Sequence, residues 1–237
     1  AQALHGVQAG RCVVSGAPAF DHWFDTTPTM SRTAFLEALG LPADGAVILY
    51  LCSSRFIAKG ETTWIAEWLR ALRASDDPRV RSAAVIVRPH PAAVVPPREW
   101  RLDDPAACVY PLETENPVSD DARMRYYHAL AHCDAVVGLN TTAMIEAAIL
   151  DKPVFSIRQA GTAQVRETLH FGHLAGGLVT VAPDLVAHVA DLGRALADPP
   201  SPDRARAFVE TFVRPLGRDR AAGDAVADLV ESVARTA

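Results

Sequence analysis

A polar turn within residues 138–154, GLNTTAMIEAAILDKPV, carries the side chains best suited to chemistry. Asn140, Thr141 and Thr142 stand where an apolar run ends and a helical pattern begins, and Glu146 follows about one turn later. A helix that begins here offers backbone N–H groups and the positive end of its dipole, and the threonines add hydroxyl donors. These groups suit a phosphate or diphosphate, with Glu146 placed to bind sugar hydroxyls beside it. The alternative is that one polar residue only caps the helix and Glu146 favours its positive end.

A second polar cluster lies in VIVRPHP, where an apolar run ends at Arg88. The guanidinium is a fixed cation with a planar fork of donors, and His90 follows two residues later as a further donor. Pro89 and Pro91 restrict the backbone on both sides of the histidine, so we expect them to aim its imidazole. A histidine by itself would favour a structural role for His90. An arginine beside it at the end of a strand favours a binding site instead.

A third run, LYLCSSRF, places Ser53, Ser54 and Arg55 in the same kind of position. Serine pairs are also common in ordinary turns, so this cluster alone does not distinguish a phosphate site from turn chemistry.

The elements that would position these clusters alternate along the chain. Short apolar runs without polar alternation are typical of parallel strands that are covered on both faces. The runs are Cys12–Ser15, Ala46–Cys52, Ala83–Val87, Ala107–Tyr110, Ala135–Leu139, Pro153–Ile157 and Leu178–Val181. Helical patterns lie between them, at 31–39 with Ser31 as cap, Glu61–Ala74, Ala122–His132, Thr142–Leu150 and Leu185–Leu196. The pattern predicts an α/β fold, a doubly wound Rossmann-like parallel sheet of about six strands with helices on both faces.

Two stretches interrupt this alternation. Pro89–Asp104 contains four prolines and is expected to be a surface excursion. Arg158–Gly177 is predicted to be a loop, and it contains Arg166 and His170 as candidates that close over a ligand or face another domain. The alternative for that loop is a solvated connector with a short helix.

Three regions are expected along the chain. Residues 1–20 are predicted to be an interdomain linker remnant with a first strand, and residues 21–200 form the Rossmann-like domain. Residues 201–237 are expected to be carboxyl-terminal helices packed on that domain, broken near Pro215 and Gly217. Trp64 and Trp68, four residues apart on one helix, are assigned to core or interdomain packing.

The charge balance and the cysteines exclude several classes. A net charge of −5, with 23 basic and 28 acidic residues in no long block, gives no field for gripping nucleic acid. Four widely spaced cysteines indicate a reduced, cytosolic chain. No apolar run approaches the roughly 18 residues of a membrane-spanning helix. His128 and His132 are assigned to a helix surface rather than to a metal site, and the sequence contains no Asp-x-Asp motif.

Motifs of other nucleotide-dependent and hydrolytic enzymes are absent from the sequence. It contains no Gly-x-Gly-x-x-Gly, no Gly-Lys-Ser/Thr and no Gly-x-Ser-x-Gly. These absences argue against a dinucleotide oxidoreductase, a phosphate-loop ATPase and a serine hydrolase.

Taken as a set, four segments carry a resemblance to a known family. They are VVSGAPAFDHWF, VILYLCSS, VIVRPHP and YYHALAHCDAVVGLNTTAMIEAAILDKPVFSI. From about Arg11 onward the chain resembles the carboxyl-terminal, nucleotide-sugar-binding half of GT-B glycosyltransferases. The nearest group contains bacterial sialyltransferases, capsule Kdo transferases, CDP-glycerol glycerophosphotransferases and UDP-GlcNAc 2-epimerases.

The resemblance implies roles for individual residues. His90, Thr141 and Thr142 match phosphate ligands, and Glu146 matches the ribose ligand, with Arg88 adding positive charge. Arg88 and His90 would stabilise the leaving nucleotide, with Arg55 and Arg166 as further candidates, and the catalytic base is not identified. Gly16, Pro18 and Asp21 resemble the segment that crosses from the amino-terminal domain, so Ala1 is expected to be a cut within a longer protein.

The function implied is that of the donor-binding half of a metal-independent GT-B glycosyltransferase, in a cytoplasmic step of bacterial surface polysaccharide synthesis. Peripheral attachment to the inner membrane through other parts of the protein stays open. The donor would be a CMP-, CDP- or UDP-linked sugar, with no other cofactor, and the missing amino-terminal domain would supply the base. The sequence lacks the epimerases' Ser-Gly-Gly turn and the paired glutamates of many retaining transferases. The alternatives are a non-catalytic GT-B-like scaffold or binding module and a sugar-nucleotide epimerase.

Overall fold

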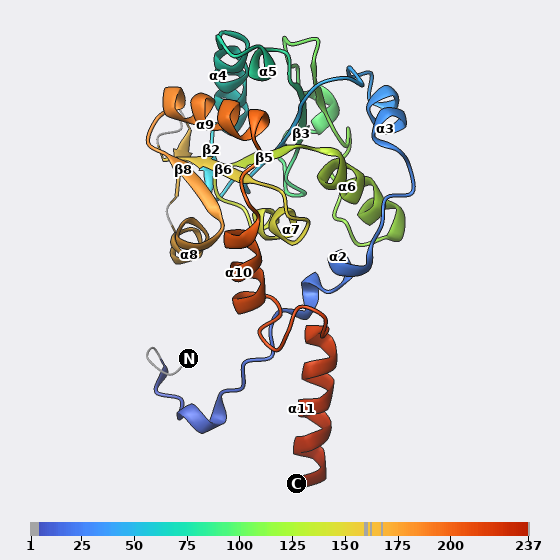
Figure 1. Cartoon of the computed structure of the whole chain (residues 1–237), viewed down its shortest axis with the longest axis vertical. Helices are drawn as coiled ribbons and strands as arrows, with labels where there is room; N and C mark the ends of the chain where they lie inside the picture. The colour runs from blue at the N-terminus through green and yellow to red at the C-terminus, as the bar shows by residue number, and fades with distance from the viewer. Residues whose placement is uncertain (1–4, 159–160, 162, 167, 237) are drawn as a thin grey trace.

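A six-stranded parallel sheet organises the chain (Figure 1). The computed structural model describes residues 5–158, 161, 163–166 and 168–236. The strands are β1 (Val47–Leu51), β3 (Ala84–Arg88), β4 (Ala107–Val109), β5 (Ala135–Gly138), β6 (Val154–Ile157) and β8 (Val179–Ala182). They confirm the predicted α/β class with one exception. Cys12–Ser15 is not a strand, because this short apolar run lies before the sheet begins and has no strand beside it in the described chain.

The strand order places a reversal at the centre of the sheet. The order is β4-β3-β1-β5-β6-β8, and every neighbouring pair is parallel. The chain therefore moves outward from β1 through β3 to β4, then returns to the other side of β1 to form β5. In open α/β sheets of this order, a crevice opens at the carboxyl ends of the two central strands. Here those strands are β1 and β5, paired from Ile48 with Ala135 to Leu51 with Gly138.

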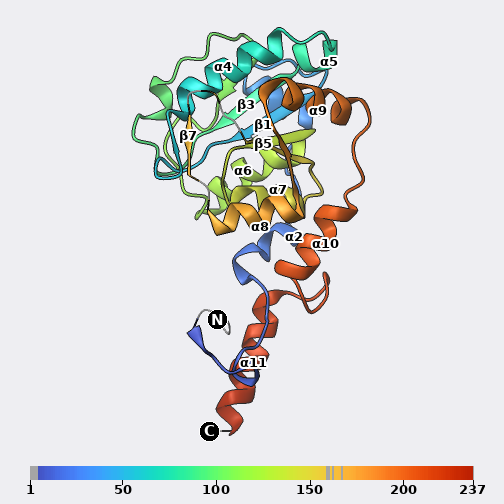
Figure 2. The ribbon, with the colours of Figure 1, turned by 90° about the vertical axis from the view of Figure 1, so that its left-hand side faces the viewer.

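Helices cover both faces of the sheet (Figures 1 and 2). One layer contains α4 (Glu61–Arg73), α5 (Pro78–Arg81) and α9 (Leu185–Ala197). The other contains α2 (His22–Asp25), α3 (Arg32–Ala38), α6 (Asp120–His132), α7 (Ala143–Ile149) and α8 (Leu169–Gly177). Alternate side chains of β1 pack into opposite layers, with Leu49 in one core and Tyr50 in the other. Trp64 and Trp68 are buried in the α4 layer, as predicted.

The segment Arg158–Gly177 is more ordered than the sequence indicated. It contains β7 (Gln164–Val165), which pairs antiparallel with β2 (Ala58–Lys59), and then α8. The Thr168 hydroxyl caps α8 by accepting a hydrogen bond from the Phe171 amide at 3.1 Å. Glycines lower the helix propensity of this stretch, and burial of its Leu174 against the core overrides that preference.

The carboxyl-terminal helices differ in their surroundings. α10 (Asp203–Phe212) packs on α7 and α8, whereas α11 (Ala222–Thr236) extends away from the sheet (Figures 1 and 2). The packing expected for both helices thus applies to α10 and to the first turn of α11, where Ala222 and Ala225 are buried. The chain is not helical between α10 and α11, where the break near Pro215 and Gly217 was expected. The Asp21 carboxylate fixes the base of α11 by accepting from the amides of Ala222 at 3.0 Å and Gly223 at 2.7 Å.

Three short 3-10 helices complete the elements of the described residues. They are η1 (Ala9–Arg11), η2 (Pro18–Phe20) and η3 (Pro97–Glu99). η3 is the only helical turn within the described excursion Pro89–Asp104, which is otherwise irregular as predicted. Among the residues described, no helix combines the length and the apolar composition needed to cross a bilayer.

Replacing Gly138 by alanine should loosen the junction of β1 and β5. The added methyl carbon would lie 2.9 Å from the backbone oxygen of Leu51, which cannot swing aside as a flexible side chain can. We expect the free energy of unfolding in urea to fall by about 1–3 kcal/mol. Gly172→Ala in α8 is the matched control, because a Cβ there meets nothing within 4 Å. Equal stabilities of the two variants would show that the contact at Gly138 is unimportant.

Candidate anion-binding site at the carboxyl edge of the sheet

A cavity of about 210 Å³, cavity A, lies at the carboxyl ends of β1 and β3 and the start of α7. The chain segments that carry the predicted clusters converge here because parallel strands deliver the chain to one edge of the sheet. The predicted residues that line cavity A are Arg88, His90, Thr141, Thr142 and Glu146. One side of α6 closes it with Tyr126, which the sequence interpretation did not include.

Arg88 supplies the positive charge of cavity A. Its side chain is almost fully buried, and the guanidinium carbon lies 3.9 Å from the centroid of the Tyr126 ring. Burial lowers its pKa, opposed by Tyr126 and by the charge of Glu146, yet an arginine side chain stays protonated in proteins. The Nη1 nitrogen is buried and has no hydrogen-bond partner among the described residues. A buried charged donor without a partner is costly, so this nitrogen favours the binding of an anion.

Glu146 also contacts Tyr126 in cavity A. Its Oε2 accepts a hydrogen bond from the Tyr126 hydroxyl at 2.6 Å. Burial raises the pKa of Glu146 to about 7, against the opposing effects of the Tyr126 hydrogen bond and the Arg88 charge. No ion pair between Arg88 and Glu146 occurs in the part of the chain that the structure describes. The acid therefore exists in both protonation states near neutral pH.

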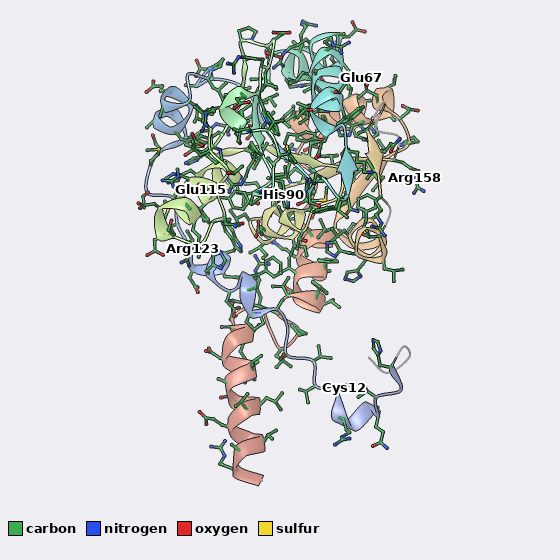
Figure 3. All side chains as sticks on the ribbon, turned by 180° about the vertical axis from the view of Figure 1, so that it is seen from behind. Cys12, Glu67, His90, Glu115, Arg123 and Arg158 are labelled. Carbon is green, nitrogen blue, oxygen red and sulfur yellow. The ribbon has the colours of Figure 1, made fainter. Side chains whose placement is uncertain are left out.

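His90 presents a single directed donor. Its Nδ1 accepts a hydrogen bond from the Ala92 amide at 3.0 Å, which leaves Nε2 to carry the proton of the neutral ring. Burial lowers the pKa of His90, which favours that neutral form at pH 7. Pro89 and Pro91 line cavity A, but the bond from Ala92 is what orients the imidazole. Figure 3 places His90 within the body of the molecule, in contrast to Arg158 at its edge.

The start of α7 corrects one expectation. The Thr141 hydroxyl accepts from the Ala143 amide at 3.4 Å, and the Thr141 carbonyl accepts from Met144 at 3.3 Å. The Thr142 carbonyl accepts from Ile145 at 2.9 Å. The amides of Ala143, Met144 and Ile145 therefore donate within the turn, because Thr141 and Thr142 supply their acceptors. These three amides are not the free donors expected from the sequence. The Thr142 side chain makes no cap bond, and it lines the cavity.

Asn140 has a structural position rather than one in cavity A. Its amide donates to the Ser53 hydroxyl at 3.1 Å, which joins the ends of β5 and β1. Its side-chain nitrogen donates to the Arg166 carbonyl at 3.0 Å and to the Thr168 hydroxyl at 3.3 Å. Asn140 and Ser53 are both buried. Asn140 therefore fixes the crevice and the segment before α8, and it does not contact cavity A.

A second cavity of about 210 Å³, cavity B, adjoins the first, and Cys52 and His90 line both. Ser53 and Arg55 line cavity B. Ser54 lines neither cavity, because its carbonyl accepts from the amides of Ile57 and Ala58 within the turn. Ser53, Ser54 and Arg55 thus lie beside cavity A rather than within it.

Glu61, at the start of α4, is a functional-site residue that sequence reasoning missed. Its two carboxyl oxygens accept from the Tyr50 hydroxyl at 3.0 Å and from the Ser53 amide at 2.8 Å. Burial raises its pKa to about 8, against the opposing hydrogen bonds. Glu61 therefore holds the turn after β1 at the floor of cavity B. In the sequence, the position of Glu61 directly after Gly60, at the start of a helical pattern, was the signal that could have indicated it.

The loop candidates do not reach either cavity. Arg166 is exposed, and its amide donates to the Ile57 carbonyl at 2.6 Å beside the β2–β7 pair. His170 lies on α8, where burial and then the neighbouring His173 lower its pKa. Neither residue lines cavity A or cavity B.

The histidine pair on α6 is buried rather than on the surface. His128 is 6% exposed and its ring bonds to Thr29, and His132 is 9% exposed and bonds to the Met30 carbonyl. The segment before α3 covers them, which the sequence period of α6 alone did not reveal. Within the described residues, no three His, Cys, Asp or Glu side chains gather as a metal site.

Comparison with known proteins establishes similarity of fold. The sequence matches no protein-family model, and no curated protein is significantly similar in sequence. A Listeria monocytogenes protein assigned as a UDP-N-acetylglucosamine 2-epimerase has a TM-score of 0.59 and 16% identity, over 96% of this chain and 55% of its own. MnaA of S. aureus, solved with UDP, has a TM-score of 0.57 and 15% identity, over 96% and 55%. The Methanocaldococcus jannaschii UDP-GlcNAc 2-epimerase, solved with UDP-GlcNAc and UDP, has a TM-score of 0.54 and 12% identity, over 95% and 56%.

The chain spans a little over half the length of these proteins. At identities this low the likeness concerns the fold. It confirms the predicted Rossmann-like α/β fold.

The protonation of Glu146 should make stability depend on pH. Its pKa is about 7 in the folded chain against an ordinary 4.5, so the protonated acid favours folding. This contribution is complete below pH 4.5 and is lost as the pH rises to about 7. We expect the difference in unfolding free energy between wild type and Glu146→Gln to fall across that window by on the order of a few kcal/mol. Urea unfolding from pH 4.5 to 8 measures it, and subtraction removes the shared effect of Glu61. A difference that rises or stays level with pH would refute the buried-acid assignment.

Proposed function

We propose that the chain is the donor-binding half of a metal-independent GT-B glycosyltransferase that acts on a nucleotide-activated sugar. The observation that carries the proposal is the buried guanidinium of Arg88, whose Nη1 lacks a partner among the described residues. The Arg88 side chain lines cavity A together with Glu146. A cation and an acid in one cavity, linked by one tyrosine, suit a ligand that places a phosphate next to vicinal hydroxyls. A nucleotide has that arrangement.

In this proposal the phosphate binds to Arg88 and His90. Arg88 supplies a charge-assisted donor from a site shielded from water, and His90 supplies its Nε2–H. The hydroxyls of Thr141 and Thr142 lie on the opposite wall, at the start of α7. As the bond from sugar to phosphate breaks, negative charge grows on the leaving nucleotide, and donors fixed in advance stabilise it most. Arg88 and His90 would therefore act as leaving-group stabilisers.

Glu146 is the proposed ligand of the ribose hydroxyls. Its carboxylate form accepts two hydroxyl donors, whereas the acid form accepts fewer and repels a phosphate less. The Tyr126 hydroxyl holds Oε2 of this carboxyl group, and in the proposal a ribose hydroxyl binds to Oε1. CMP, CDP and UDP all offer such hydroxyls, so cavity A does not select among them by this contact.

A second domain is part of the proposal. The chain matches a little over half of each similar structure, and α11 extends from the body with Val230 62% exposed. We propose that an amino-terminal domain supplies the acceptor site and the general base, in a cytoplasmic step of bacterial surface polysaccharide synthesis. Alone, this chain should bind the donor without turnover.

Two alternative functions, an epimerase and a non-catalytic scaffold, can be separated from a glycosyltransferase. The reaction product identifies an epimerase, and the absence of nucleotide binding identifies a scaffold. The solved structures named above with UDP or UDP-GlcNAc include a 2-epimerase, which keeps epimerisation as a second candidate. Incubation of the full-length protein with nucleotide sugars separates them, because an epimerase changes the sugar without an acceptor. A scaffold that has lost the site would show no nucleotide-dependent change in melting temperature.

Nucleotides should stabilise the chain through Arg88. At a concentration of about 100 times Kd, binding to the folded state should raise Tm by roughly 5–10 °C. A thermal-shift panel of CMP, CDP and UDP identifies the nucleotide. Arg88→Met should weaken its binding about 10- to 100-fold, because a charge-assisted hydrogen bond is lost. His90→Ala should weaken it less, since the neutral imidazole is a weaker donor.

The control for charge is Arg70→Met, which removes an exposed arginine on α4 outside both cavities. It should leave the nucleotide-induced shift unchanged. Protection of the Arg88 and His90 variants equal to that of wild type would eliminate cavity A as the phosphate site.

A further inference from the structure

The outer wall of cavity B is apolar although it faces solvent. Val94 and Val95 line it and are 66% and 50% exposed. Trp100 lines the same cavity and closes the loop by donating from Nε1 to the Val95 carbonyl at 3.1 Å. Isolated exposed valines are common, whereas adjacent valines and a tryptophan around one cavity indicate a surface that a ligand covers. The excursion Pro89–Asp104 therefore forms one wall of cavity B in addition to running over the surface.

The inner wall of cavity B is polar and fixed. Ser53, Thr62 and Arg55 line it, and the Ser53 hydroxyl is held by the Asn140 amide. The Arg55 guanidinium carbon lies 4.7 Å from the centroid of the Phe56 ring. Both carboxyl oxygens of Glu61 are occupied by Tyr50 and Ser53, so Glu61 positions this wall. A cavity with one apolar wall and one hydroxyl-bearing wall matches a sugar ring, which has C–H faces and hydroxyl edges.

The two cavities share His90 and Cys52 in their linings, so they lie next to each other. If the ribose lies against Glu146, the phosphate lies toward Arg88 and His90, and the remainder of the donor continues past His90. Each cavity is about 210 Å³, and ligand pockets are typically roughly 300–1,000 Å³. Neither cavity alone reaches that range, whereas the two joined do.

We infer that cavity B binds the glycosyl group of the donor, with the apolar face or an apolar substituent of the sugar against Val94, Val95 and Trp100. This inference rests on the proposed function, and it adds the position of the sugar and the segment that selects it. The excursion Pro89–Asp104 is then the specificity loop, because it supplies His90 to the phosphate and the apolar wall to the sugar. Sugars that carry an acyl or methyl substituent gain more from that wall than sugars with hydroxyls alone.

The test is titration calorimetry with matched ligands on wild type and a Val94→Ser, Val95→Ser double variant. The ligands are CMP, CDP and UDP, each alone and linked to a sugar, with UDP-glucose and UDP-N-acetylglucosamine as the pair that differs by an acyl group. The double variant should bind the preferred nucleotide sugar at least about five-fold more weakly. It should bind the bare nucleotide within about two-fold of wild type.

Both valines are largely exposed, so their replacement should leave folding intact. Val118→Ser, at a valine that is 73% exposed and outside cavity B, is the matched control and should change neither affinity. Trp100→Phe is a second variant that keeps an aromatic face and removes the bond to Val95.

The outcomes separate this inference from the proposed function. Equal weakening of the bare nucleotide in the double variant would overturn the inference, because it would place the nucleoside in cavity B. Unchanged affinity for the nucleotide sugar would also overturn it while leaving nucleotide binding in cavity A in place. If wild type binds no nucleotide at all, the proposed function fails and this inference fails with it.

Discussion

The candidate site depends on one interaction, the contact of the Arg88 guanidinium with the face of the Tyr126 ring. One buried nitrogen of this cation, Nη1, has no hydrogen-bond partner among the described residues. A buried charge is tolerated only where neighbouring groups compensate it. The aromatic face compensates part of it, and the nearby carboxyl of Glu146 compensates more when it is ionised. The part of the Arg88 charge that these groups do not compensate attracts an anion to cavity A. The fold serves this arrangement by placing β3, α6 and α7 around one point.

The crevice itself follows from strand order. Because β5 returns to the side of β1 opposite β3, the helices that follow β1 and β5 lie on different faces of the sheet and leave a gap between them. Asn140 bonds to Ser53 across that gap, and Glu61 fixes the turn that carries Ser53. Hydrogen bonds among Asn140, Ser53 and Glu61 thus fix the turns that border cavities A and B.

Much of the site was predictable from the sequence because it rests on short-range patterns. Apolar runs predicted the strands, and polar residues at their ends predicted that Arg88, His90 and the Thr141–Thr142 pair would meet at one edge. Tyr126 was not predicted, since its partner Glu146 belongs to a different helix. Glu61 was not predicted, since the sequence pattern does not show that the start of α4 turns back to the end of β1. The sequence also could not show that Thr141 would engage the first amides of α7, or that glycines in α8 would be overridden by the burial of Leu174.

The most direct test of the central claim is a crystal structure of the chain with the nucleoside diphosphate that stabilises it most. We expect a phosphate oxygen within hydrogen-bond distance of the Arg88 guanidinium and a ribose hydroxyl against the Glu146 carboxyl group. A nucleotide bound elsewhere on the molecule, or one whose base rather than phosphate meets Arg88, would contradict it.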